Sequence, residues 1–141
     1  MSTNSGAIFD FSKVDLVIGS GFRVDAYADA GLALNWQGDR FTVAVGADDI
    51  NVIIAVNSTY AIFTSNNMQS AKFMSYVSAW LDAGVPRPLS FEDRSGLTIL
   101  SDARAIPRQN PNMTFNNAHN ARAIDIHCPN LRGTVGGLLD A

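Results

Sequence analysis

The chain has 141 residues, of which 47% are hydrophobic and 16% are charged, and its formal net charge at pH 7 is −3. This length fits one domain built around one core. Lys and Arg together number 10 and are scattered along the chain, which argues against a protein that binds nucleic acid through the phosphate backbone.

The first predicted elements are a hairpin and a loop. Apolar residues alternate with polar ones over residues 14–18, a Gly-Ser-Gly sequence interrupts the pattern, and the alternation resumes over residues 22–27. This period of two predicts a pair of antiparallel strands. The stretch from Asp29 to Asp39 contains two glycines. It could be a short strand around residues 32–36 or a long loop, and we favour a loop that contains a short strand.

The next stretch is predicted to be a second hairpin, with two apolar rows on either side of an acidic turn. The turn contains Asp48 and Asp49, residues that favour turns because their side chains hydrogen-bond to nearby backbone. The period of two on both sides of the turn is typical of half-buried strands. The apolar rows are Phe41, Val43 and Val45 before the turn, and Val52, Ile54 and Val56 after it.

One amphipathic helix is predicted after this hairpin. Asn66 is a favourable N-cap residue, and Gln69 three positions later completes the spacing of a capping box. Gly84 is expected to end the helix. The apolar residues at helical intervals are Phe73, Met74, Val77, Trp80 and Leu81. A stripe of this kind is typical of a helix that covers one face of a sheet.

The C-terminal part is predicted to contain a third hairpin and one further strand. The hairpin joins Pro88–Phe91 to Leu97–Ser101 through a glycine-containing turn. A loop rich in Pro and Asn follows over residues 107–111. Alternation over Arg122–Cys128, ending at a proline, predicts the last strand, and the glycine-rich tail Gly133–Ala141 is expected to be loosely attached.

Domain organisation and compartment are constrained by what the sequence lacks. Cys128 is the sole cysteine, so an internal disulfide is impossible and the simplest expectation is folding in a cytoplasm. The N-terminus has no basic segment followed by an apolar one, and no apolar run approaches the roughly 20 residues that span a bilayer. We expect a single domain over residues 1–141 with no membrane insertion, and a loose arm of about 12 N-terminal residues.

No motif for catalysis, metal binding or cofactor binding is evident. His119, His127 and Cys128 could begin a metal site, but neighbouring strand residues point to opposite faces, so His127 and Cys128 do not readily share one ion. The Asp48-Asp49 pair is better explained by turn chemistry than by acid–base or Mg²⁺ chemistry. There is no GxSxG elbow. We therefore predict a protein that is not an enzyme and has no cofactor.

Six sequence segments, in this order and spacing, resemble the tail tube proteins of contractile-tailed bacteriophages. The resemblance extends from about Val14 to Leu131, and none of the segments is a catalytic fingerprint. The segments are GFRVD at Gly21–Asp25, TVAVGADD at Thr42–Asp49, IFTSNNMQSA at Ile62–Ala71, PLSFEDRSG at Pro88–Gly96, DARAIPRQNP at Asp102–Pro111 and IHCPNL at Ile126–Leu131.

The resemblance implies a mainly β fold with one flanking α-helix, a β-sandwich or open barrel of the tail tube type. It implies hexameric rings that stack into the inner tube of a phage tail, located in the virion and assembled in the bacterial host cytoplasm. The expected partners are other copies of the chain and the tail sheath, tape measure, baseplate and tail terminator proteins. Genomic DNA would pass through an acidic lumen without specific binding.

Self-assembly surfaces are then the expected functional sites. The strands around Phe41–Val45 and Val52–Val56 would line the channel through their polar face, and the loop from Asp29 to Asp39 would reach the adjacent ring. The residues expected to carry self-assembly are Phe41, Val43, Val45, Val52, Ile54, Val56, Asp29, Asp39, Asp48 and Asp49.

Three alternative functions stay open on the sequence. The first is a tube protein of a tailocin or of a type VI-like secretion system, which shares the architecture and moves protein. The second is a monomeric β-sandwich binding module that grips a ligand with Tyr27, Trp36 and Tyr60. The third, an enzyme, would depend on His119 or His127.

Overall fold

The computed structural model describes residues 11–46, 51–69, 71–118 and 120–136. In this part of the chain the protein is mainly β, with one α-helix and a short 3-10 helix, Phe11–Lys13. The elements in chain order are β1 (Val14–Ile18), β2 (Phe22–Arg23), β3 (Tyr27–Trp36), β4 (Phe41–Val45), β5 (Asn51–Ala55), β6 (Ala61–Met68), α1 (Lys72–Ala83), β7 (Arg87–Asp93), β8 (Thr98–Pro107), β9 (Ala121–Cys128) and β10 (Arg132–Thr134).

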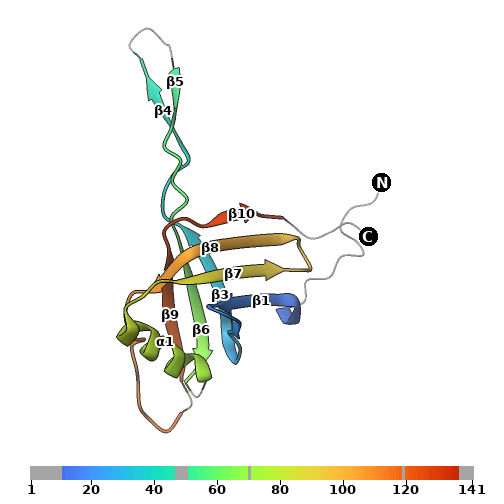
Figure 1. Ribbon diagram of the computed structural model, residues 1–141, viewed down its shortest axis with the longest axis vertical. Coiled ribbons are helices and arrows are strands. Elements are labelled where there is room, and N and C mark those ends of the chain that lie inside the picture. Colours follow the sequence, from blue (N-terminus) through green and yellow to red (C-terminus); the bar gives the residue numbers. More distant parts are fainter. Residues whose placement is uncertain (1–10, 47–50, 70, 119, 137–141) are drawn as a thin grey trace.

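Eight strands form one antiparallel sheet, in the order β2-β1-β7-β8-β9-β6-β3, with β10 added alongside β8. β4 and β5 form a separate two-stranded antiparallel hairpin. Figure 1 shows β1, β7 and β8 running across the direction of β3, β6 and β9, with the hairpin projecting from this body along the long axis of the molecule. The body and the hairpin are therefore distinct parts of the fold.

β8 joins the two strand groups of the body because it changes partners along its length. Its first part pairs with β7 and β10, whereas Ile106 and Pro107 at its end pair with β9. The change occurs beside a register shift in the β7–β8 ladder, where β8 has one more residue than β7 between two successive pairs. The buried carboxylate of Asp102 lies here and accepts hydrogen bonds from the backbone N–H groups of Arg104 at 2.8 Å and Asn130 at 2.7 Å. Asp102 therefore supports the bend in β8 and the connection between β9 and β10.

Helix α1 packs against the sheet through one apolar stripe. Phe73, Val77 and Trp80 are buried, while the remaining stripe residues, Met74 and Leu81, are partly buried against the same core. The helix ends at Gly84, whose left-handed backbone (φ 66°) allows its N–H to donate to the carbonyl of Trp80. The sheet supplies the other core side chains, chiefly Leu16, Ile18, Phe63, Leu89, Leu100, Ile124 and Ile126. The prediction of a helix covering a sheet is confirmed.

The three predicted hairpins are present as β1–β2, β4–β5 and β7–β8, and the last strand is present as β9. Alternation identified these elements correctly because their side chains do alternate between two faces. Several ends differ from the prediction. The second strand of the first hairpin ends at Arg23, and Tyr27, predicted to lie in it, belongs to β3. β8 continues to Pro107, and the tail begins later than Gly133, because Gly133 and Thr134 belong to β10 and pair with Leu100 and Ile99.

In the stretch from Asp29 to Asp39, the short strand predicted around residues 32–36 is present, whereas the loop predicted before it is wrong. Residues 29–36 belong to β3, a strand of 10 residues that pairs with β6. Gly31 has φ +63° and lies within a register shift of this ladder. A β-bulge accommodates such a residue inside a strand, so a glycine that suggested a loop instead marks a bulge.

The predicted helix start at Asn66 is also wrong. Asn66 lies in β6, where its side-chain amide donates to the carbonyl of Gly31 at 3.3 Å, and Ala71 precedes the helix. β6 alternates buried and half-buried residues along its whole length. One of its two buried polar residues, Asn67, donates to the carbonyl of Asp25 at 2.8 Å. Polar residues satisfied inside a sheet imitated the sequence pattern of a helix cap.

Candidate self-association surface

The projecting hairpin continues the ladder between β3 and β6. Beyond the last pair of that ladder, the N–H of Gln37 donates to the carbonyl of Tyr60 at 2.9 Å. Further out, the N–H groups of Val56 and Asn57 both donate to the carbonyl of Arg40, at 2.8 and 3.0 Å. Asn57 has φ 60°, a left-handed conformation that Asn tolerates. Two donors on one acceptor are the signature of a β-bulge, so the hairpin is joined to the body by a continuous backbone ribbon with one bulge.

The register of the hairpin shows that both of its faces are apolar. Residues directly opposite each other in a ladder point to the same face. Val43 lies opposite Ile53, so the Phe41 row shares its face with Ile53, whereas Val52 and Ile54 share the other face with Ala44 and Thr42. The two predicted apolar rows thus lie on opposite faces. The predicted polar face does not exist in the described strands, because each strand places an apolar row on a different side.

These apolar side chains are exposed in the single chain. The exposed fraction is 62% for Val43, 79% for Val45 and 71% for Ile53 on one face, and 47% for Ile54 on the other. The half-burial expected from the alternation is therefore wrong for the isolated chain, since no element of the body covers the hairpin (Figure 1). Large contiguous apolar surfaces of this kind mark protein–protein contact sites.

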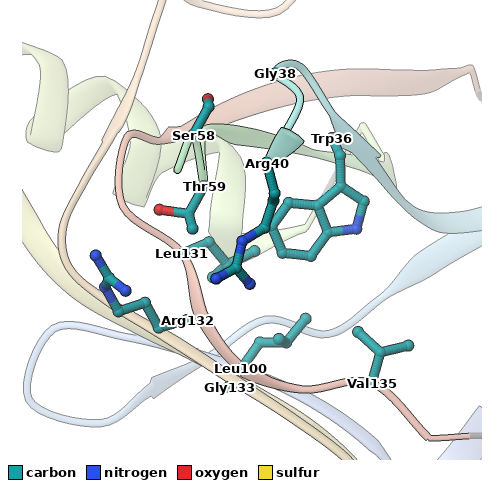
Figure 2. A pocket seen from close by; sticks show the side chains of 10 residues that line it. All are labelled: Trp36, Gly38, Arg40, Ser58, Thr59, Leu100, Leu131, Arg132, Gly133 and Val135. Atoms are coloured by element: carbon teal, nitrogen blue, oxygen red, sulfur yellow. The ribbon is translucent and has the colours of Figure 1, made fainter. Parts of the chain in front are cut away.

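A hollow lies at the foot of the hairpin, with a volume of 320 Å³. Figure 2 shows the guanidinium group of Arg40 directed into it beside the indole of Trp36, with Leu100, Leu131 and Val135 on its other sides. Arg132 also lines the hollow. Within the described residues, no carboxylate lies within ion-pair distance of either arginine. The hollow therefore combines positive charge with apolar walls, a combination suited to an acidic group carried on an apolar segment.

The remaining predicted assembly residues fall in different places. Asp29 is exposed on β3, and Asp39 lies in the stem of the hairpin, where its carbonyl accepts from the N–H of Ser58. Asp48 and Asp49 lie outside the described residues. No sequence pattern predicts the hollow, since its lining comes from segments as distant as Trp36 and Val135, which only the folded sheet brings together.

The residues considered for ligand binding or chemistry do not form a common site in the described chain. Tyr27 and Trp36 occupy the two ends of β3, roughly 30 Å apart at about 3.3 Å per residue. Tyr60 hydrogen-bonds and stacks with His127, their ring centroids 5.7 Å apart. An aromatic patch shared by Tyr27, Trp36 and Tyr60 is therefore absent, and His119 lies outside the described residues.

In the part of the chain that the structure describes, Cys128 and Tyr27 have raised pKa values. Burial, with a smaller contribution from the nearby carboxylate of Asp102, raises the pKa of the Cys128 thiol from 9.0 to about 12. Burial also raises the pKa of Tyr27 from 10.0 to about 12. Both groups are neutral at physiological pH. No three His, Cys, Asp or Glu side chains of the described residues gather as a metal site would require.

No protein-family model matches the chain, and comparison with curated proteins finds no match to its sequence. Among the described residues, none of the helical structure is long and apolar enough to cross a membrane.

Proposed function

We propose that this chain is the repeating subunit of the inner tube of a contractile phage tail. The observation that carries the proposal is the β4–β5 hairpin, which projects from the body and exposes apolar side chains on both faces. A monomer gains nothing from such an element, whereas a subunit buries it against other copies. The sequence resemblance to tail tube proteins supports the same assignment independently.

The edges of the sheet support lateral association into a ring. The sheet is open: β3 forms one edge, with 10 residues, and β2 forms the other, with only 2. A long edge strand presents unpaired backbone groups that pair with another chain. Pairing between unlike edges of successive copies is a head-to-tail interface, which closes into a ring when the rotation per copy permits.

The charge of the chain suits passage of DNA through the tube. The formal net charge is −3. A wall of negative sign repels phosphate, so the genome moves without binding. In this proposal the apolar hairpin and the sheet edges contact other copies, and the sheath, tape measure, baseplate and tail terminator proteins meet the assembled tube. The virion tail is then the final location.

The direct test is negative-stain electron microscopy of the purified chain over a concentration series, with size-exclusion chromatography on the same samples. The proposal expects rings or hollow tubes that grow with concentration. A chain that stays monomeric at every concentration, even when mixed with preformed tube ends from a tail of the same kind, contradicts it. A tube subunit must add to such an end even if it nucleates poorly alone.

A further inference from the structure

The segment 108–118, here called the 108–118 loop, lies at the opposite end of the long axis from the hairpin. Figure 1 shows it in orange below the body, between β8 and β9. It exposes two large apolar side chains: Phe115 is 78% exposed and Met113 is 51% exposed. The molecule therefore carries exposed apolar groups at both ends.

Hydrogen bonds of its two neighbours and one contact of its own ring position Phe115 in the loop. The side-chain amide of Asn120 donates to the carbonyl of Thr114 at 3.0 Å and to the side-chain oxygen of Asn116 at 3.1 Å, so both neighbours of Phe115 are tied to one residue. The guanidinium carbon of Arg122 lies 5.4 Å from the centre of the Phe115 ring. An exposed ring fixed in this way loses little conformational freedom when it is covered, which favours binding.

The two ends also differ in the charges that their sequences carry. β4 and β5 contain no charged residue and the sequence joining them contains Asp48 and Asp49, whereas Arg108 begins the 108–118 loop, and Arg122 and Asp125 belong to β9. Within the described residues no carboxylate lies within ion-pair distance of Arg108 or Arg122. The Nε of Arg122 is buried without a hydrogen-bond acceptor. The charge at the loop end is thus left without a partner in the single chain.

We propose that the 108–118 loop is the docking surface for the β4–β5 hairpin of a second copy of this chain in the next ring. This rests on the proposed tube function and identifies the surface that receives the hairpin. The stem and strand residues 37–46 extend roughly 30 Å at about 3.3 Å per residue, enough to reach a neighbouring body. Contact between opposite ends repeats without limit along an axis, which produces stacking.

The test uses two variants that each damage one end. Phe115→Ser damages the loop and Val45→Lys damages the hairpin, and both side chains are largely exposed, so each variant is expected to fold. Leu97→Ser is the matched control, because Leu97 is 54% exposed in the β7–β8 turn, away from both ends. Circular dichroism verifies folding, and Met113→Ser replaces the loop variant if Phe115→Ser fails to fold. Rings of each variant are assembled separately and their masses are measured before and after mixing.

Each damaged variant alone is expected to stop at single rings, while the Leu97 control forms tubes as long as those of the unmodified chain. An equimolar mixture is expected to give ring pairs with a twofold increase in mass, because the intact hairpin of one variant meets the intact loop of the other and further growth is blocked. Normal tubes from Phe115→Ser, or a mixture that stays at single rings, would overturn the proposal while leaving the tube function standing. An unmodified chain that forms neither rings nor tubes overturns both.

Discussion

Replacing Val43 or Ile54 with Asp separates the contribution of the hairpin to folding from its contribution to assembly. Val43 and Ile54 lie on opposite faces, and both remain largely exposed in the single chain. Surface substitutions of this kind change the free energy of unfolding by about 0.5 kcal/mol or less. By contrast Ile126→Ala, in the closed core, is expected to cost about 2–5 kcal/mol. Each hairpin variant should therefore unfold at nearly the same temperature as the unmodified chain.

Assembly is expected to respond far more strongly. Covering the exposed part of one such side chain contributes about 1 kcal/mol, taken as roughly half of the value for a full Val or Ile side chain. Over the six copies of the proposed ring this sums to about 6 kcal/mol, or roughly 10⁴-fold in the equilibrium between free and stacked rings. Tubes should be absent at all accessible concentrations.

The assay is the lowest concentration at which tubes sediment, together with thermal unfolding of the same samples. Val43→Ile and Ile54→Val are the matched controls, since they keep both faces apolar, and both should form tubes. Because the two positions lie on different faces, loss of tubes in only one Asp variant would mean that only that face is covered. Normal tubes from both would refute the reasoning, as would a loss of about 2 kcal/mol or more in unfolding free energy.

Three further substitutions test the body of the fold. Asp102→Ala removes two charge-assisted hydrogen bonds to backbone N–H groups and is expected to lower the unfolding free energy by about 3 kcal/mol, measured in urea; an unchanged midpoint would show that the β8 bend does not need this carboxylate. Because the pKa of the Cys128 thiol is raised from 9.0 to about 12, the contribution of the neutral thiol to the free energy of unfolding is complete below pH 9 and is lost as pH rises through 12. The urea midpoint should therefore fall over this range, and it should fall less steeply in Cys128→Ala. Gly133 has φ +142°, and Gly133→Ala would place a Cβ 2.0 Å from the carbonyl oxygen of Ile99, so β10 should detach from β8 at a cost of about 1–3 kcal/mol. Hydrogen exchange at the Thr134 amide should then become fast, and slow exchange would show that the reasoning is wrong.

The sequence predicted the parts of the fold whose side chains alternate locally. β9 follows from Ile124, Ile126 and Cys128, which are all buried on one side. The helix follows from its stripe and from Gly84. These signals arise within a few residues, so they can be recognised in the sequence without knowledge of the fold.

The errors came from residues whose meaning depends on distant partners. Gly31 suggested a loop, but β6 pairs with β3 on both sides of it and converts it into a bulge. Asn66 suggested a helix cap, but β9 pairs along the whole of β6 and keeps that residue extended. The opposite faces of Val43 and Ile54 depend on the register of the hairpin, which alternation alone leaves undetermined. The hollow needs residues from four segments of the chain.

The pairing of β6 with β9 has a consequence for the order of events during synthesis. Ala61 pairs with Cys128, so the body cannot close until most of the chain has left the ribosome. The β4–β5 hairpin needs only its own residues, and isolated hairpins form within about 1–10 μs. The pairing of β4 with β5 can therefore form before the pairing of β6 with β9. Nascent chains on one polysome hold such hairpins close together, and a holdase that covers apolar strands should raise the yield of competent subunits more than it raises their final stability.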